Sequence, residues 1–330
     1  MARDIIVEGA GILGLWQALA LARDGHRVRL VDRAANPLET SASAQAGAML
    51  APDCEAEATP AIVRNAGRDA LNIWIATVPG IVRAGTLVTA LPRDLPDLDL
   101  FARKTDNHRT LDTAGIAAIE PELADRFQKA LYFSEEAHLV PPTASAFLLD
   151  RARASGVAVE FGETHHGDPS ADALVVDCRG LAARDILPDL RGVRGERLLL
   201  NTPEVTLMRP VRLLHPRHPI YVVPWGEGRF LLGATMIESE DGGPITVRSA
   251  LDLLAAAYAL VPAFGEAQIL EATSGLRPAF PDNVPRARVL GPGRIAVNGA
   301  YRHGWLLAPI LAEAVADYLR DGRKHPLITA

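Results

Sequence analysis

The chain of 330 residues contains only two cysteines, Cys54 and Cys178. Two cysteines are too few for a disulfide scaffold or a thiolate metal site, and they suit a protein of the reducing cytoplasm. Lysine is also scarce, with three residues, so nearly all of the positive charge comes from arginine. The net charge is −6 and no basic stretch stands out, which argues against nucleic acid as a partner.

Long apolar runs are absent too, so no segment is expected to cross a membrane. Arg3 precedes an apolar stretch, as in a signal peptide, but Glu8 and Gln17 interrupt it and no small-residue cleavage pattern follows. We therefore expect a soluble, cytoplasmic protein. The hydrophobic content of 48% is ample for a folded core, and the length favours two domains.

The histidines give no sign of a metal site. His165 and His166 lie in a polar turn segment, as do His215 and His218. Neither pair has the helical i, i+4 spacing or the acidic partners that a metal site needs. We expect solvated loop histidines and no bound metal.

A glycine-rich turn near the N-terminus organises the rest of the sequence. A β-branched run leads into Gly9-Ala10-Gly11-Ile12-Leu13-Gly14, then a helical period, then a strand that ends at Asp32. Gly9 permits a tight turn, Gly11 lets a pyrophosphate approach the backbone, and Gly14 lets the helix pack closely on the strand. The phosphates would lie at the positive end of the helix, while Asp32 would accept the hydroxyls of an adenosine ribose. The pattern predicts a dinucleotide without a 2′-phosphate; the alternative is a purely structural turn.

Glu8 does not fit this pattern, because it places a carboxylate directly before Gly9, near an anionic pyrophosphate. We expect its side chain to point away from the ligand.

The remaining pattern changes from mixed helices and strands to mainly strands. Expected helices are Pro60–Val78, Asp112–Ile119, Thr143–Ala154, Val247–Tyr258 and Trp305–Leu319. Expected strands are Ile81–Ala90, Ala130–Ser134, Val157–Phe161, Ala173–Asp177, Glu196–Asn201, Val205–Val211, Ile220–Pro224, Arg229–Ala234 and Arg294–Val297, with a turn at Pro92–Leu100. The block with a period of two residues indicates an antiparallel sheet separate from the nucleotide domain.

Four motifs spread over nearly the whole chain carry a family resemblance. They are GAGILG with Asp32, AGAMLAP at Ala46–Pro52, YVVP and GATM within Tyr221–Met236, and GLRP at Gly275–Pro278 followed by NGAYRHG. With these motifs the chain resembles the flavin-dependent D-amino-acid-oxidase superfamily, and within it the glycine oxidases of thiamine biosynthesis. The resemblance implies an α/β fold: a Rossmann-like FAD-binding domain with an inserted antiparallel β substrate domain, and non-covalently bound FAD.

Together with the strand pattern, this resemblance gives a division into domains. We expect the discontinuous FAD-binding domain at residues 1–80, 138–190 and 276–330. The substrate-binding domain would comprise residues 81–137 and 191–275.

The resemblance also implies roles for individual residues. Arg277 would pair with the substrate carboxylate, Tyr221 would donate to it, Met49 and Met236 would wall a small pocket, and Arg302 would lie at the flavin ring. The residues expected to contact FAD are Gly9, Gly11, Ile12, Leu13, Gly14, Asp32, Arg33, Ser43, Ala46, Gly47, Met49, Leu50, Cys178, Gly180, Arg277, Gly299, Arg302, His303, Gly304, Trp305 and Leu306.

General chemistry agrees with these roles. An arginine fork holds a carboxylate by two parallel charge-assisted hydrogen bonds, which would direct the substrate Cα–H at the flavin. A helix that begins near Gly304 would aim free backbone N–H groups at the flavin edge where negative charge gathers on reduction. The alternatives are an interdomain salt bridge for Arg277 and a core residue for Tyr221. Cys178 is expected to be a small residue packed near the nucleotide, with a nucleophile as the alternative.

The sequence departs from the family pattern twice. Cys178-Arg179-Gly180-Leu181 stands where the family usually has an Ala/Ser-Gly-Ala-Trp type of sequence, and Trp225 replaces an arginine after YVVP. Both departures leave the fold intact and bear on the exact substrate.

The expected function is therefore an FAD-dependent oxidase of glycine or a similar small amino acid, with O2 as the acceptor and homo-oligomers as a possible assembly. An FAD-dependent D-amino-acid dehydrogenase that uses a quinone and a sarcosine-type N-methyl amino acid oxidase are the nearest rivals. A binding protein that keeps the nucleotide for structure alone is the rival from another class.

Overall fold

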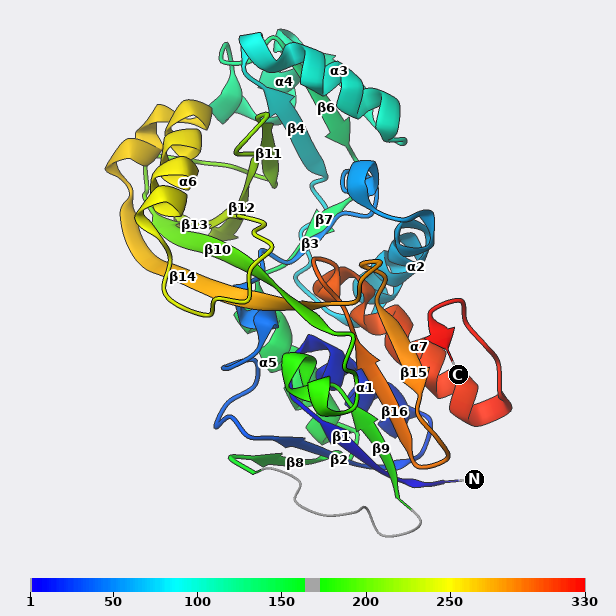
Figure 1. Cartoon of the computed structure of the whole chain (residues 1–330). Helices are drawn as coiled ribbons and strands as arrows, with labels where there is room; N and C mark the ends of the chain where they lie inside the picture. The colour runs from blue at the N-terminus through cyan, green and yellow to red at the C-terminus, as the bar shows by residue number, and fades with distance from the viewer. Residues whose placement is uncertain (1, 164–172, 330) are drawn as a thin grey trace.

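The computed structural model describes residues 2–163 and 173–329, so His165 and His166 lie outside the described residues. The chain forms a lower layer built on a seven-stranded sheet and an upper layer built on an eight-stranded sheet (Figure 1). A two-stranded ribbon of β3 (Met49–Leu50) and β7 (Ala137–His138) lies between them. This is the expected α/β fold with a second, strand-rich domain.

The seven-stranded sheet gathers segments from both halves of the chain. Its order is β17 (Ile328–Thr329), β15 (Arg286–Val289), β16 (Arg294–Asn298), β9 (Leu174–Asp177), β1 (Asp4–Glu8), β2 (Arg27–Asp32) and β8 (Ala158–Phe161). From β16 to β8 every pair is parallel. Parallel strands end at one edge of the sheet, so the turns after β1, β2, β9 and β16 meet there.

Four helices accompany this sheet. They are α1 (Ile12–Arg23), α2 (Ala61–Thr77), α5 (Pro141–Ala154) and α7 (Gly304–Asp321). Their apolar residues share one core with the strands, in which Trp74 makes ring contacts with Trp16 and Trp305. The indole N–H of Trp74 donates to the carbonyl of Trp305 at 2.7 Å, which ties α2 to the first turn of α7.

The eight-stranded sheet is antiparallel except for one pair. Its order is β14 (Gln268–Ala279), β10 (Arg191–Asn201), β13 (Arg229–Gly233), β12 (Ile220–Gly226), β11 (Val211–Leu214), β4 (Thr86–Ala90), β6 (Lys129–Phe133) and β5 (Arg109–Asp112). The exception is the parallel pair of β4 and β11. Helices α3 (Leu95–Lys104), α4 (Thr113–Ile119) and α6 (Val247–Leu260) pack in this layer, and the long strands β10 and β14 reach down toward the first sheet (Figure 1).

Three sequence expectations about local structure were wrong. Pro92–Leu100 is a 3-10 turn followed by α3, because proline is tolerated in the first turn of a helix and Leu98 and Phe101 bury one helical face. The expected strand at Ile81–Ala90 begins only at Thr86, after Gly85 with φ of +75°.

The third error is the strand expected at Val205–Val211, of which only Val211 belongs to a strand. Val205 and Leu207 are buried as the pattern suggested. The backbone N–H groups of Thr206 and Met208, however, donate to the carboxylates of Glu122 and Glu120 and not to a neighbouring strand. The segment therefore has the alternating burial of a strand but lacks the backbone hydrogen bonds to a neighbouring strand.

None of the described helices is long and apolar enough to cross a bilayer. The described residues also contain no group of three His, Cys, Asp or Glu side chains that could hold a metal ion.

Candidate active site

A cavity of about 760 Å³ extends from the glycine-rich turn to the eight-stranded sheet. Its walls include Gly9 and Asp32 from the first sheet and Tyr221 and Arg277 from the second. Cavities of this size are typical of small-molecule and cofactor sites, and this one joins the two expected binding regions.

Two glycines of the N-terminal turn are required by close backbone approach. Gly9 has φ of +99°, and a Cβ there would lie 2.7 Å from the carbonyl oxygen of Cys178. A Cβ on Gly14 would lie 1.7 Å from the carbonyl oxygen of Gly9, so α1 can begin directly against the turn only with glycine. Gly11 faces Ser41 and Ser43 across the cavity, with no atom closer than 3.5 Å to its Cβ position. An alanine methyl group at Gly11 would thus make only ordinary contacts, so packing within the protein does not require glycine there as it does at Gly9 and Gly14.

Asp32 lies at the end of β2 and lines the same end of the cavity. Its carboxylate accepts hydrogen bonds from the backbone N–H groups of Ala10, at 2.5 Å, and Ala34, at 2.8 Å. These bonds hold the carboxylate beside the glycine turn, where it retains lone pairs for a ribose.

Glu8, which did not fit the glycine-turn pattern, contacts Arg179, which belongs to one of the two departures from the family pattern. Glu8 and Asp177 are adjacent in register on β1 and β9, which would place two carboxylates side by side. Arg179 lies 3.4 Å from Glu8, 2.6 Å from Asp177 and 3.0 Å from Asp185, and Arg294 lies 3.6 Å from Glu8 and 3.2 Å from Asp177. Two guanidinium groups therefore compensate the carboxylate before Gly9.

Two helices begin at this cavity. Helices α1 and α7 have no side-chain hydrogen bond at their N-caps, Gly11 and His303. The N–H of Ile12 donates to the hydroxyl of Ser43, at 3.2 Å, and the carbonyl of Ser43 accepts from the indole of Trp305, at 3.0 Å. The positive ends of two helices at one cavity fit a pyrophosphate at α1 and the electron-rich edge of a flavin at α7. The residues present therefore fit FAD.

Most of the predicted site residues line this one cavity. They are Gly9, Gly11, Ile12, Leu13, Asp32, Arg33, Ser43, Ala46, Gly47, Met49, Cys178, Gly180, Tyr221, Met236, Arg277, Arg302, His303, Gly304, Trp305 and Leu306.

Three predicted residues do not line it. Gly14 packs against the turn, Leu50 is fully buried in the core, and Gly299 lies beneath the ring of Phe280, with φ of +73°. Two of the three are glycines required by backbone packing, and Leu50 points away from the cavity side of its strand. Their contact with FAD stays a prediction, and in this structure they shape the site from behind its wall.

Arg277 projects from β14 across Gly195 of the neighbouring strand β10. A Cβ on Gly195 would lie 2.3 Å from Cζ, Nη1 and Nη2 of Arg277, so glycine leaves the space that the guanidinium fills. Nη1 donates to the carbonyls of Thr235, at 3.1 Å, and Arg194, at 3.3 Å. Burial lowers the pKa of Arg277, and no carboxylate of the described residues lies within ion-pair distance. Hydrogen bonds thus fix the Arg277 guanidinium at the cavity wall, where it has no acidic partner among the described residues.

Tyr221 lies next to Arg277 in a slot made by two other glycines. A Cβ on Gly47 would lie 2.9 Å from the tyrosine ring, and one on Gly233 would lie 2.8 Å from its hydroxyl. Burial raises the pKa of the Tyr221 hydroxyl, which keeps it protonated and able to donate. Its position on the cavity wall excludes the alternative of a core tyrosine that has no access to a ligand.

Glu55 holds the two residues that precede α7. Its carboxylate lies 3.0 Å from Arg302 and 3.3 Å from His303. Burial opposes ionisation of Glu55, but the Arg302 guanidinium lowers the pKa of this carboxyl well below its usual range. Arg302 also lies 3.3 Å from the sulfur of Met236, so the expected pocket wall and the expected flavin contact meet.

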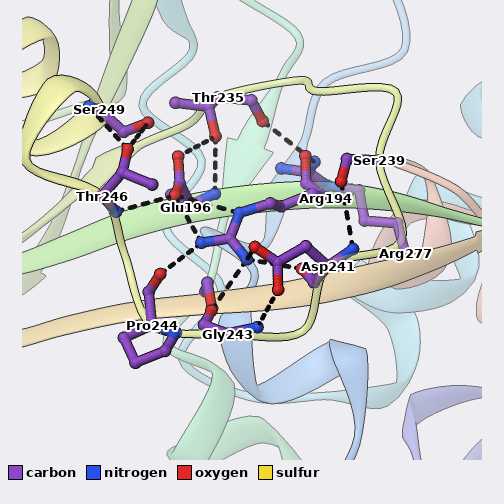
Figure 2. Close-up of polar contacts among 11 residues, drawn as sticks. Arg194, Glu196, Thr235, Ser239, Asp241, Gly243, Pro244, Thr246, Ser249 and Arg277 are labelled. Carbon is purple, nitrogen blue, oxygen red and sulfur yellow. Dashed lines mark hydrogen bonds and ion pairs between the residues drawn. The ribbon is translucent and has the colours of Figure 1, made fainter.

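A buried polar cluster fixes the loop that carries Met236. The guanidinium of Arg194 donates to Glu196 and to the carbonyls of Asp241, Gly243 and Pro244, as Figure 2 shows. Glu196 in turn accepts from Thr235 and from the N–H of Thr246. Because Arg277 donates to the carbonyls of Arg194 and Thr235, the same cluster fixes the base of the Arg277 fork.

Sequence reasoning missed three residues of the site. Gly195, Glu55 and Arg212 all line the cavity. Gly195 was visible as a glycine inside an apolar strand pattern, which often marks close approach of another group. Arg212 was visible as one cation within the strand VRLL. Nothing local to Glu55 pointed to Arg302, which is 247 residues away.

The two cysteines and Trp225 have structural surroundings. Cys54 and Cys178 are free, buried thiols whose pKa values are raised by burial, so neither is an activated nucleophile. Trp225, at the position where the family has arginine, is 8% exposed and packs with Leu199, Val223 and Leu231.

Comparisons with known proteins agree with this geometry. A Rhizobium etli protein named as a thiamine biosynthesis oxidoreductase, ThiO, is 52% identical over 324 residues, 98% of each chain. A glycine oxidase of Geobacillus kaustophilus is 25% identical over 355 residues, 95% of this chain and 92% of that protein. The crystal structure of glycine oxidase from Bacillus cereus has the same fold, with a TM-score of 0.82 at 22% identity, over 98% and 96% of the two chains. Since residues 4–318 also match the family described as FAD dependent oxidoreductase, DAO, the chain belongs to this family of FAD-dependent enzymes.

Proposed function

We propose that the protein oxidises glycine or a similarly small amino acid with bound FAD and passes the electrons to O2, as a step of thiamine biosynthesis. The observation that carries this proposal is Arg277, a partly buried cation on the wall of the cavity that also contains the glycine turn, with no carboxylate of the described residues within ion-pair distance. A substrate carboxylate supplies the missing anion. The similarity to ThiO and to glycine oxidase supports the choice of glycine.

FAD and the side chains of the cavity have separate roles in this reaction. FAD, when bound, accepts the two electrons and the hydrogen that leave the substrate Cα. Arg277 binds the carboxylate as a fork, and Tyr221 donates to the same group, which fixes the orientation of the substrate. Met49 and Met236 limit the space beyond Cα, which favours small side chains. The site residues, the domain boundaries, a homo-oligomeric state and a cytoplasmic location remain predictions.

Anaerobic mixing with a panel of amino acids tests the proposal. Glycine should bleach the flavin absorbance, and re-oxidation by air should release hydrogen peroxide. Reduction by larger D-amino acids without peroxide release would favour a quinone-linked dehydrogenase, and preference for sarcosine would favour an N-methyl amino acid oxidase. A protein that keeps its flavin oxidised with every substrate would be a binding protein.

The Arg277→Ala variant tests the carboxylate contact. A desolvated carboxylate without its partner costs several kcal/mol, so KM for glycine should rise by about two orders of magnitude. Lysine at position 277 should recover little, because it cannot form the fork. If Arg277→Ala slows a simple amine without a carboxylate as much as it slows glycine, with FAD still bound, the arginine holds the domains together and the substrate binds elsewhere.

A further inference from the structure

A second arginine lies on the wall of the substrate cavity. Arg212 is on β11, directly opposite Tyr221 of β12 in an antiparallel pair. Side chains of opposite residues in such a pair project from the same face of the sheet. Arg212 and Tyr221 both line the cavity, so the side chain points toward the region where Tyr221 and Arg277 would hold a substrate.

The contacts of Arg212 leave most of its donor capacity unused. Nη1 donates to the carbonyl of Cys54 and lies 3.7 Å from its sulfur, and the guanidinium lies 5.4 Å from the centre of the Phe101 ring. A guanidinium has five N–H donors. Within the part of the chain that the structure describes, no carboxylate lies within 4.0 Å of Arg212 and no hydrogen bond involves its Nε or Nη2.

The nearby acid is already engaged. Glu55 follows Cys54 in the chain, but its two oxygens contact Arg302 and His303. Among the arginines that line this end of the cavity, Arg302 pairs with Glu55 and Arg197 pairs with Glu271, whereas Arg277 and Arg212 have no carboxylate of the described residues within 4.0 Å. The single carboxylate of glycine can match only one of them.

We propose that Arg212 is a second anion-binding residue, which gives the pocket a preference for small amines with two acidic groups over those with one. The inference rests on the proposed function, since Arg277 takes the carboxylate next to the oxidised Cα. Arg212 then binds the second acidic group, as in an N-carboxymethyl glycine such as iminodiacetate. Arg212 is partly buried, and a cation withdrawn from water is costly without an anion, so pairing it with a second acidic group favours the doubly acidic ligand.

The chemistry of oxidation is unchanged by the second group. Loss of two electrons and two protons across one Cα–N bond of iminodiacetate gives the imine, which water cleaves to glycine and glyoxylate. O2 takes up the two electrons and two protons as hydrogen peroxide. The second carboxylate takes no part in bond making or breaking.

The alternative for Arg212 is a structural one, in which it only supports the Cys54 carbonyl and hence the Glu55 segment. A buttress of that kind would affect ligands with one and two carboxylates equally. An anion-binding residue would affect only the second class. The ratio of the two affinities therefore separates the two roles.

A pair of inert ligands measures this ratio without turnover. Diglycolate and methoxyacetate share the chain CH2–O–CH2–COO⁻ and differ by one carboxylate, and neither has an amine to oxidise. Each is titrated into the FAD-loaded protein and binding is followed by the flavin spectrum. The wild type should bind diglycolate about tenfold or more tightly than methoxyacetate, in line with one additional charge-assisted hydrogen-bonded contact.

Three variants complete the test. Arg212→Met should remove the preference for diglycolate and leave the affinity for methoxyacetate within a factor of about two, whereas Arg212→Lys should keep part of the preference. Arg248→Met is the matched control, because Arg248 is an exposed residue of α6 outside the cavity and its loss changes the net charge equally. The preference should be unchanged in that variant.

The outcomes also separate this inference from the proposed function. If glycine reduces the flavin but the wild type binds the two ligands equally, or if Arg212→Met weakens both to the same extent, Arg212 is not an anion-binding residue. If glycine fails to reduce the flavin while the diglycolate preference depends on Arg212, the proposed substrate is wrong and the anion site stands. The ratio of kcat/KM for iminodiacetate to kcat/KM for sarcosine should depend on Arg212 in the same way as the ratio of the two affinities.

Discussion

The Gly195→Ala variant offers a sharp test of the substrate end, because a single added methyl group would collide with the Arg277 guanidinium. The three atoms nearest to the Cβ position are Cζ, Nη1 and Nη2 of Arg277, all at 2.3 Å. Ordinary contact requires about 3.5 Å, so the guanidinium must retreat by about 1 Å. Misplacement of this size costs about 100-fold in rate, or about 3 kcal/mol of transition-state binding.

The assay compares kcat/KM for glycine and the affinity for glycolate in the wild type, in Gly195→Ala and in Gly192→Ala. Gly192 lies on the same strand, but a Cβ there would be 3.4 Å from Leu181 and 3.5 Å from Leu276, which is ordinary contact. Gly192→Ala should therefore behave as the wild type. The argument is refuted if Gly195→Ala retains FAD and both glycine kinetics and glycolate affinity stay within a factor of about two of the wild type.

Two further predictions concern pH and the cofactor. Burial raises the pKa of Glu136 from 4.5 to about 7, so the unfolded chain loses this proton first and the free energy of unfolding falls by about 3 kcal/mol as pH rises through that range. Denaturant melts of the Glu136→Gln variant should lack this pH dependence. The buried His138, whose pKa is lowered to about 4, contributes the opposite slope to both proteins and cancels in their difference. A difference in stability between the two proteins that stays constant with pH would contradict the assignment. Asp32→Ala should weaken FAD binding by about 1.5–3 kcal/mol, since a ribose loses a charged acceptor. Titration of the apoprotein with FAD measures this change. An unaltered affinity would show that Asp32 only accepts hydrogen bonds from the backbone of Ala10 and Ala34 and does not contact the ribose.

The residues that sequence reasoning missed lie at the substrate end of the site and not at the cofactor end, for a physical reason. Gly9, Gly11 and Asp32 lie within one strand–turn–helix–strand unit, so their spacing alone determines how they meet. The substrate end depends on contacts between distant segments. Gly195 matters because β10 and β14 pair in one particular register, and Glu55 matters because α7 begins beside its loop. Neither contact can be predicted from the local periodicity of the sequence.

The errors in local structure have the same origin. The segment at Val205–Val211 has the alternation of a strand, but Glu120 and Glu122 take the N–H groups that a neighbouring strand would need. Leu98 and Phe101 bury a helical face in a segment whose prolines suggested a turn. Glu8 could be recognised as unusual from the sequence, but its compensation by Arg179 and Arg294 requires three strands to lie side by side.

The order of strands in the seven-stranded sheet has a consequence for biosynthesis. β1, which emerges from the ribosome first, needs β9 on one side, and β9 needs β16, while α1 packs mainly against α7. The sheet that binds the nucleotide is therefore complete only when residues up to Thr329 have been translated, whereas the strands from β4 to β14 can pair earlier. Acquisition of FAD is in this way a late event, and a nascent chain that stops before α7 would expose the apolar face of α1 to chaperones instead of to a partner helix.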